Sequence, residues 1–268
     1  MSHNAAPIGV FDSGIGGLTV VRELIRQLPN ESIIYFGDTA RVPYGPKSPD
    51  TVLRYSREIT EYLRGQGIKA MVIACNTATA HALPALRAEN DLPIVGVIEP
   101  GSRAAARATT GGRVGVIGTY GTINSRAYEK AIAAAAPSTM ITALPCPLFV
   151  PLVEEGWLET EATTLIAKAY LAPLVDAKID TLVLGCTHYP LLKRVIGLTV
   201  GRDVRLIDSA EETAAETAAI LADAGLTHAD NGGARYRFIA SDAPEQFLRV
   251  GQRFLGASID RVETVTLG

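Results

Sequence analysis

The sequence predicts an α/β protein of two pseudo-symmetric, doubly wound lobes with mainly parallel sheets and an active site in the cleft between them. Short apolar runs alternate with helical patterns, as strands joined by crossover helices do. A repeat is the second observation: residues 68–77 and 179–188 are each an apolar run ending in a cysteine and a small polar residue. The cysteines, Cys75 and Cys186, are 186 − 75 = 111 positions apart in a chain of 268 residues, one in each half.

Eight short apolar runs are predicted to be strands, four in each half of the chain. Several of them are apolar throughout, as expected for parallel strands that helices cover on both faces. In chain order they are residues 8–11, 32–37, 70–74, 94–97, 114–117, 140–143, 181–184 and 204–207.

Two helices between these strands carry clear signals. Ser48 followed by Pro49 is a favourable helix start, and the segment closes at Gly65. Its apolar residues recur at helical spacing: Val52, Tyr55, Ile59 and Leu63. Residues 161–176 form the counterpart in the second half, with an expected apolar stripe. That stripe consists of Leu165, Ala169 and Ala172.

The repeat extends to the first strand of each half. Residues 8–13 (Ile-Gly-Val-Phe-Asp-Ser) align with residues 114–119 (Val-Gly-Val-Ile-Gly-Thr) at an offset of 106. A repeat of this extent belongs to whole domains and not to a single motif.

Two alanine-rich helices are expected to carry the chain between the lobes. Residues 93–100 and 203–210 are each a short strand leading into such a helix. The first lobe is therefore predicted to comprise residues 1–98 plus 209–268, and the second lobe residues 99–208.

Composition narrows the class of protein. The chain is 47% hydrophobic and 20% charged, which is ordinary for a globular protein. No apolar stretch reaches the roughly 20 residues of a membrane span, and a net charge of −3 argues against a nucleic-acid-binding surface. The three cysteines form no CxxC pair, so neither a disulfide framework nor a standard zinc ribbon is expected. We expect a cytoplasmic protein with neither membrane nor nucleic-acid partners.

Each cysteine of the repeat follows a predicted strand and precedes a predicted helix. Ligands of open α/β sheets bind at the carboxyl ends of strands. The N–H groups at a helix start can lower a cysteine pKa below about 8.5 and can hold a substrate carboxylate. Asn76, Thr77 and Thr187 add side-chain donors at these points. Buried cysteines most often only pack, as we expect for Cys146, but two at equivalent positions favour a functional role.

Other polar positions leave alternatives open. The glycine-rich loop 12–17 can bind an anion through backbone N–H groups or be a tight turn, but Thr19 stands where a dinucleotide fingerprint needs glycine. Tyr44-Gly45 suits a binding loop or a turn. His188 suits a helix start, a proton-handling group, or a zinc ligand with both thiols, which is less favoured because no fourth ligand is identifiable. Glu154 suits a solvated surface.

Four motifs together resemble those of the glutamate racemases, cofactor-independent members of the aspartate/glutamate racemase superfamily. The resemblance runs from Ile8 to about Phe254, and the extended glycine and Pro-Tyr-Gly motifs favour glutamate over aspartate racemases. The motifs are residues 11–17 (Phe-Asp-Ser-Gly-Ile-Gly-Gly), 43–45 (Pro-Tyr-Gly), 74–77 (Ala-Cys-Asn-Thr) and 184–190 (Leu-Gly-Cys-Thr-His-Tyr-Pro).

The resemblance implies facing lobes that hold the substrate between Cys75 and Cys186, which act as proton acceptor and donor, with no cofactor and no metal. It implies that Asp12 and His188 support the respective thiols. Substrate contacts are implied for Asp12, Ser13, Tyr44, Gly45, Asn76, Thr77, Thr187 and His188. Asp38 and Glu154 sit where the family places second-line polar groups, and a homodimer is implied.

The expected function is the reversible interconversion of L- and D-glutamate, which supplies D-glutamate for bacterial peptidoglycan. The alternatives are a racemase of another small acidic amino acid and a non-catalytic protein that binds a small anion or a metal. Some relatives carry an N-terminal extension associated with activation by a cell-wall precursor. Only seven residues precede the first predicted strand, so that regulation is not expected.

Overall fold

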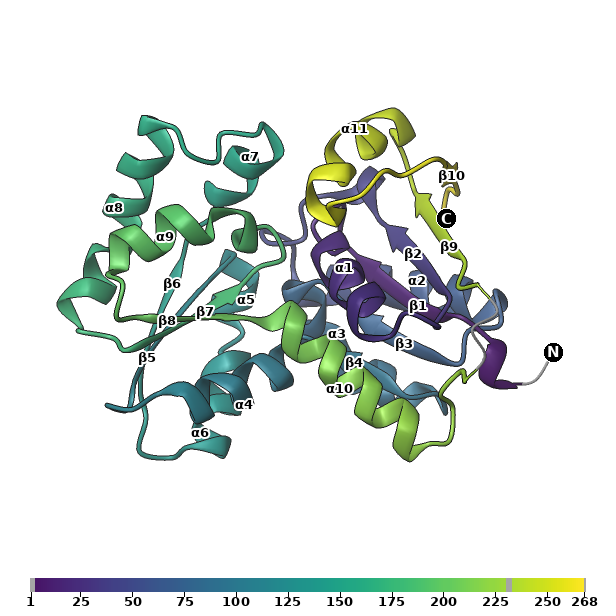
Figure 1. The fold of residues 1–268 in the computed structure, drawn as a ribbon, viewed down its shortest axis with the longest axis horizontal. Helices are drawn as coiled ribbons and strands as arrows, with labels where there is room; N and C mark the ends of the chain where they lie inside the picture. Colours follow the sequence, from purple (N-terminus) through teal and green to yellow (C-terminus); the bar gives the residue numbers. More distant parts are fainter. Residues whose placement is uncertain (1–2, 230–232, 268) are drawn as a thin grey trace.

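The fold contains two parallel β-sheets side by side, each flanked by helices (Figure 1). It is seen in a computed structural model that describes residues 3–229 and 233–267. The larger sheet contains β1 (Ile8–Asp12), β2 (Ile33–Gly37), β3 (Ala70–Ile73), β4 (Ile94–Gly96), β9 (Tyr236–Ala240) and β10 (Val262–Thr264). The smaller sheet contains β5 (Arg113–Gly118), β6 (Met140–Pro145), β7 (Thr181–Gly185) and β8 (Arg205–Asp208). We call each sheet with its helices the first and the second lobe, respectively.

The strand orders show that the sequence repeat is a repeat of topology. The larger sheet runs β10-β9-β2-β1-β3-β4 and the smaller β6-β5-β7-β8. The order β2-β1-β3-β4 is thus matched strand for strand by β6-β5-β7-β8, and all these pairings are parallel. The predicted fold class is confirmed. All eight predicted strands are present, whereas β9 and β10 were not predicted.

Helices cover both faces of the first-lobe sheet. These helices are α1 (Leu18–Gln27), α2 (Pro49–Gly65), α3 (Asn76–Glu89), α10 (Ser209–Asp223) and α11 (Pro244–Leu255). Successive strand residues point to opposite faces, so Val10 packs with α1, α10 and α11, and Phe11 packs with α2 and α3. Helices on both faces are what doubly wound sheets require.

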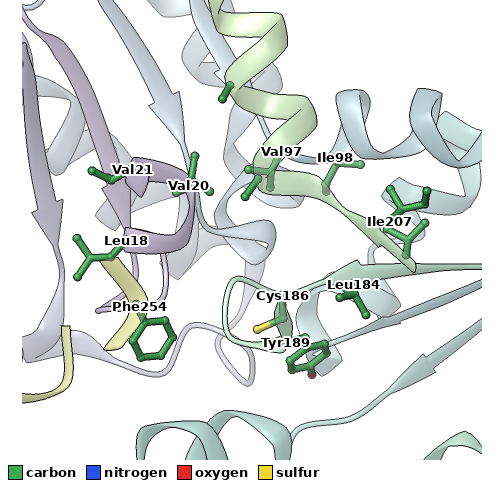
Figure 2. Packing of buried hydrophobic residues seen from close by; sticks show 14 of the residues in the cluster. Leu18, Val20, Val21, Val97, Ile98, Leu184, Cys186, Tyr189, Ile207 and Phe254 are labelled. Carbon is green, nitrogen blue, oxygen red and sulfur yellow. The ribbon is translucent and has the colours of Figure 1, made fainter. Parts of the chain in front are cut away.

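The second lobe is covered in the same way. Its helices are α4 (Ile98–Ala108), α5 (Tyr120–Asn124), α6 (Ala127–Ala135), α7 (Phe149–Glu154), α8 (Glu161–Asp176) and α9 (Lys193–Val200). In Figure 1, α4 and α6 lie below the sheet and α8 and α9 above it. The core under α1, α10 and α11 continues into this lobe, as Figure 2 shows around Val97, Leu184 and Phe254.

The two helix predictions had different outcomes. Ser48 caps α2, accepting the Thr51 N–H at 3.3 Å, and three of the four predicted apolar residues are fully buried. The stripe predicted for α8 is wrong, because Leu165, Ala169 and Ala172 are exposed. The buried face consists of Thr163, Ala167, Leu171 and Leu174. Apolar residues occur all round this helix, so spacing alone did not define its inner face.

The helices α4 and α10 follow β4 and β8 and carry the chain between the lobes, where they pack against each other. The lobe boundaries at 98/99 and 208/209 stay a prediction, and residues 1, 2, 230–232 and 268 lie outside the described part of the chain. None of the helices in residues 3–229 and 233–267 is long and apolar enough to cross a membrane.

A buried ion pair closes the base of the first-lobe sheet. The Lys69 ammonium lies 2.5 Å from the Glu31 carboxylate and donates to the carbonyls of Asn4 (2.6 Å) and Leu226 (2.8 Å). Lys69 and Glu31 are 1% and 2% exposed, so each charge depends on the other.

We expect Lys69→Met to lower the free energy of unfolding by about 3 kcal/mol, because it leaves Glu31 charged, buried and uncompensated. Urea unfolding of the variant and wild type measures the loss. Lys168→Met, on the exposed face of α8, is the control and should stay within about 0.5 kcal/mol of wild type. An equally stable Lys69→Met protein would contradict the expectation.

Candidate active site

A cavity that both lobes line lies at the carboxyl ends of equivalent strands. Residues following β1 and β3 line it from the first lobe, and residues following β5 and β7 line it from the second. This is where open parallel sheets bind ligands. The lining residues are Asp12, Ser13, Pro43, Tyr44, Gly45, Cys75, Asn76, Thr77, Thr119, Thr122, Val150, Cys186, Thr187 and His188. All ten residues predicted for the site are among them, and their individual roles stay a prediction.

Three threonines form a hydroxyl cluster across the lobes. Thr77 lies 2.9 Å from Thr119 and 3.2 Å from Thr122, and the latter two are 3.2 Å apart. Thr119 and Thr122 were missed as site residues. The repeat contained a signal for Thr119, because the alignment of the first strands pairs it with Ser13.

Cys75 is a buried thiol at the start of α3. Its Sγ accepts the Ala78 N–H at 3.4 Å and donates to Ser13 Oγ at 3.7 Å. Burial, and then the charge of Asp12, raise the pKa of Cys75 to about 12 despite these hydrogen bonds. The expectation that the helix start would lower this pKa is therefore wrong: 5% exposure and a neighbouring carboxylate outweigh the N–H groups.

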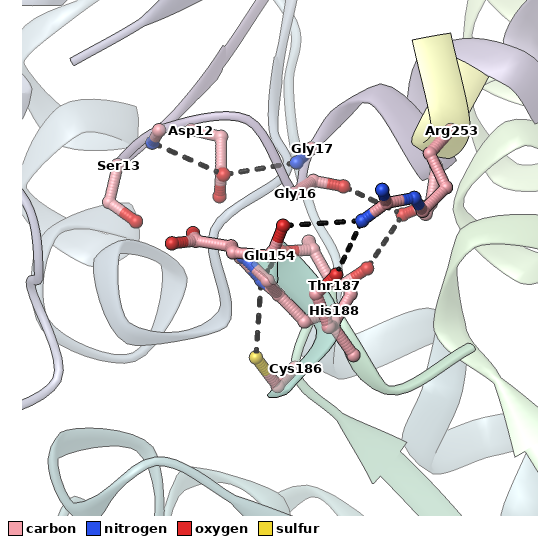
Figure 3. Close-up of polar contacts among 12 residues, drawn as sticks. Asp12, Ser13, Gly16, Gly17, Glu154, Cys186, Thr187, His188 and Arg253 are labelled. Atoms are coloured by element: carbon pink, nitrogen blue, oxygen red, sulfur yellow. Dashed lines mark hydrogen bonds and ion pairs between the residues drawn. The ribbon is translucent and has the colours of Figure 1, made fainter. Parts of the chain in front are cut away.

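The Asp12 carboxylate accepts hydrogen bonds from backbone N–H groups of the glycine-rich loop 12–17. Its Oδ2 accepts the N–H groups of Gly17 at 3.0 Å and Gly14 at 3.3 Å (Figure 3). Burial raises the pKa of Asp12, although the charge of His188 and the backbone N–H groups oppose this. Since a protein carboxylate already holds these two N–H groups, they are not free to cradle an anion.

The loop needs glycine because it approaches the second lobe closely. A Cβ on Gly16 would lie 2.3 Å from Thr187 Oγ1 and 2.5 Å from His188 Nδ1. The backbone conformation of Gly17 does not require glycine, because its φ of −60° is open to any residue. Thr19, which breaks the dinucleotide fingerprint, donates to the Thr187 carbonyl at 3.2 Å. The loop is therefore a contact surface between the lobes.

Cys186 has a different environment from Cys75. A helix follows Cys186 as predicted, but it begins as a 3-10 helix: His188 is its N-cap, it starts at Tyr189, and α9 follows directly at Lys193. Its Sγ lies 3.9 Å from His188 Nδ1, and His188 Nε2 lies 2.9 Å from Glu154 Oε1. Glu154 is thus a histidine partner and not a fully solvated glutamate.

His188 carries a positive charge in this setting. Burial alone would lower its pKa, but the hydrogen bonds and charges of Cys186 and Glu154 outweigh burial and raise the pKa to about 10. The edge of the Phe254 ring, from α11, packs on the imidazole with ring centroids 5.1 Å apart.

Arg253 in α11 holds the end of α7. Its Nη1 donates to the carbonyls of Val153 at 2.9 Å and Glu154 at 3.2 Å (Figure 3). The guanidinium therefore satisfies carbonyls that the end of a helix leaves unpaired. Because Arg253 lies about a hundred positions along the chain from α7, no local pattern indicates this contact.

Asp38 holds Tyr44 in the wall of the cavity. It accepts hydrogen bonds from the Tyr44 hydroxyl, Arg41 Nε at 2.7 Å and Ser241 Oγ at 2.9 Å. Tyr44 is 1% exposed, and the Gly45 carbonyl accepts the N–H of Gly121 from the second lobe at 2.8 Å. The Pro-Tyr-Gly segment is therefore packed between the lobes.

The zinc alternative needs three ligands converging on one point. Within the described ranges, no group of three or more His, Cys, Asp or Glu side chains is arranged to hold a metal ion. Two thiols facing a cavity lined with hydroxyl and amide donors suit a small carboxylate instead.

Comparison with known proteins decides the family. The model of the Asp/Glu/Hydantoin racemase family matches residues 8–217. The chain belongs to this family. Among curated relatives, the glutamate racemase of Geobacter metallireducens is 56% identical over 97% of this chain and 96% of its own length. That of Neisseria meningitidis serogroup A is 52% identical over 98% and 97%.

Solved structures of racemases match the whole fold. A glutamate racemase isoform from Bacillus anthracis superposes with a TM-score of 0.95 at 46% identity, covering 99% of both chains. The Francisella tularensis glutamate racemase in complex with D-glutamate gives 0.92 at 40% identity, covering 98% of both. The two-lobed racemase fold thus extends over essentially the entire chain.

We expect Gly16→Ala to lower kcat/KM for glutamate racemisation by at least about 100-fold, because the added methyl displaces Thr187 and His188 by a sizeable fraction of an ångström. Steady-state kinetics with each enantiomer measures the effect. Gly65→Ala is the control, since its Cβ meets nothing within 4 Å. Wild-type kinetics in a folded Gly16→Ala protein would show that the close contact is not required.

The pKa of His188 rises from 6.5 in the unfolded chain to about 10 in the fold. Its contribution to stability is therefore complete below pH 6.5 and is lost as the pH rises towards about 10, at up to about 1.4 kcal/mol per pH unit. We expect His188→Gln to flatten this decline in urea unfolding between pH 6.5 and 9. His81→Gln should show the same decline in stability with pH as wild type, because burial lowers the pKa of His81. Equal declines in wild type and His188→Gln would contradict the assignment.

Proposed function

We propose that the chain interconverts L- and D-glutamate by proton transfer between the substrate α-carbon and two thiols. The observation that carries the proposal is the placement of Cys75 and Cys186 at equivalent strand ends of two lobes, lining one cavity. Glutamate racemases are the relatives at 56% and 52% identity, and one of the matching structures holds D-glutamate.

In each turnover, one cysteine acts as a thiolate and removes the α-proton. The other acts as a thiol and delivers a proton to the opposite face, so one proton is taken and one returned. The reverse reaction exchanges the two roles. A two-base racemisation needs one acid–base group on each face of the substrate, and two sulfurs supplied by opposing lobes satisfy that need.

A thiolate alone is too weak a base for an amino-acid α-proton, so the site must stabilise the carbanion-like state. Buried donors aimed at the α-carboxylate do this in a cavity that excludes water. We assign these donors to Thr77 and Thr187, which are 2% and 7% exposed, and we assign to Asn76, 3% exposed, the binding of the carboxylate in ground and transition states alike. Holding the α-carbon in line with both sulfurs lowers the barrier further. This scheme requires neither a metal nor a cofactor.

The resting protein differs at its two thiols. Asp12 lies near Cys75, and the imidazolium of His188 lies beside Cys186. We assign the thiol form to Cys75 before substrate binds, because burial and the charge of Asp12 raise the pKa of this thiol. Asp12 and His188 are then the supporting groups of the respective sulfurs, with Glu154 behind His188.

The similarity to glutamate racemases supports three further proposals about the use of the product, the location and the assembly. We propose that D-glutamate from this protein enters bacterial peptidoglycan, that the protein acts in the cytoplasm and that it forms a homodimer. Its substrate partner is free glutamate.

The test is incubation with each glutamate enantiomer in deuterated water. Wild type should drive the optical rotation to zero and place deuterium at the α-carbon. Cys75→Ala and Cys186→Ala should each lower racemisation by about 1,000-fold or more, because each removes one of the two acid–base groups. Cys146→Ala is the matched control: this cysteine is equally buried but does not line the cavity, so racemisation should stay within about twofold of wild type.

Full racemase activity in both cavity variants would disprove the two-thiol scheme. Unchanged glutamate with the wild-type protein would favour a binding protein. Exchange with aspartate but not glutamate would favour a racemase of another acidic amino acid.

A further inference from the structure

Tyr128 joins the two lobes at the edge of the cavity, outside the residues that line it. It belongs to α6 in the second lobe and is 2% exposed. Its hydroxyl donates to Asn76 Oδ1 at 2.8 Å, across the lobe boundary. Its ring packs on Gly185, where a Cβ would lie 3.0 Å from Tyr128 Cε2. Tyr128 therefore touches the residue after Cys75 and the residue before Cys186.

The Asn76 amide is held on one side only. Its Oδ1 accepts from Tyr128, whereas Nδ2 is buried and makes no hydrogen bond to any described residue. A buried N–H donor without an acceptor is destabilising. Because Asn76 lines the cavity, a substrate carboxylate is the natural acceptor for this NH2 group.

The direction of the amide matters for binding. A half-turn about the last side-chain bond of Asn76 would exchange Oδ1 and Nδ2 and aim a carbonyl oxygen at the substrate carboxylate. Burial raises the pKa of the Tyr128 phenol, and a hydrogen bond with Ser209 opposes this only in part, so the phenol keeps its proton. A protonated phenol can donate to Oδ1 and keep Nδ2 on the cavity side.

Tyr128 also lies where the crossing helices meet. A Cβ on Gly101 of α4 would lie 3.6 Å from the Tyr128 ring and 3.2 Å from Ser209 Cβ of α10. The phenol is thus fixed by the two helices that carry the chain between the lobes, and its orientation does not depend on the substrate.

We infer that Tyr128 is a positioning residue that orients the Asn76 amide so that its NH2 group binds the carboxylate of the substrate. The inference rests on the proposed function and goes beyond it, by naming a residue that acts on the substrate only through Asn76. A second-lobe residue, Tyr128, thereby orients a donor of the first lobe, the Asn76 amide, directly beside Cys75.

The test is Tyr128→Phe, which removes one hydroxyl and keeps the ring. We expect KM for both glutamate enantiomers to rise about tenfold while kcat stays within about twofold of wild type. The reason is that the variant loses one charge-assisted hydrogen bond that is made equally in the ground state and the transition state. In an Asn76→Ala background the same change should alter kcat/KM by less than about twofold, because no amide remains to orient.

Tyr189→Phe is the matched control. Tyr189 is also fully buried in the second lobe, and its hydroxyl donates to the Cys146 carbonyl at 2.8 Å. Both variants should lower the midpoint of thermal unfolding by similar amounts, but only Tyr128→Phe should change KM. A merely structural role of Tyr128 predicts losses of equal size with and without Asn76.

The outcomes separate the inference from the function. A wild-type protein that does not racemise glutamate overturns both. An active wild type with unchanged KM in Tyr128→Phe, or with equal effects in the two backgrounds, overturns only the role of Tyr128.

Discussion

Gly16 lies against Thr187 and His188, and the close approach of the two lobes at the cavity depends on that contact. Two twisted sheets facing each other leave an open crevice unless some backbone comes very close, and a residue without a Cβ makes this possible. Thr19 then bonds to the Thr187 carbonyl, and α11 covers His188 with Phe254. First-lobe residues thus contact both Thr187 and His188, the two residues after Cys186, so neither lobe forms this site alone.

The duplicated scaffold supplies matching positions, and the residues around them supply opposite charges. An acidic group near Cys75 disfavours a thiolate there, while the imidazolium of His188 lies beside Cys186. A perfectly symmetric site would hold both sulfurs in the same protonation state and lack either a base or an acid. The departures from the repeat, Asn76-Thr77 against Thr187-His188, therefore have a chemical purpose.

Much of the fold and of the site could be predicted from the sequence, because each strand and each motif is a short continuous stretch of residues. Apolar runs defined eight strands, polar residues at the strand ends pointed to the paired cysteines and their neighbours, and the resemblance to glutamate racemases added Tyr44 and Gly45. Contacts between distant segments were not predictable: Arg253 on α7, Tyr128 on Asn76 and Asp38 on Tyr44 join elements that meet only after folding. The pKa of Cys75 was misjudged for the same reason, because burial and a neighbouring carboxylate are tertiary effects.

Strands β9 and β10 have no counterpart in the second lobe, and this affects the order in which the chain can fold during synthesis. Strands β5 to β8 are contiguous in sequence, so the second lobe can assemble its whole sheet while translation is still under way. The first-lobe sheet cannot be complete until β9 and β10 have left the ribosome. Phe254 and Arg253 lie in α11, between β9 and β10, so a nascent chain cannot cover His188 with Phe254 until translation has passed well beyond the second lobe. The two halves of the site are therefore made in sequence: the histidine first, and the ring that covers it later.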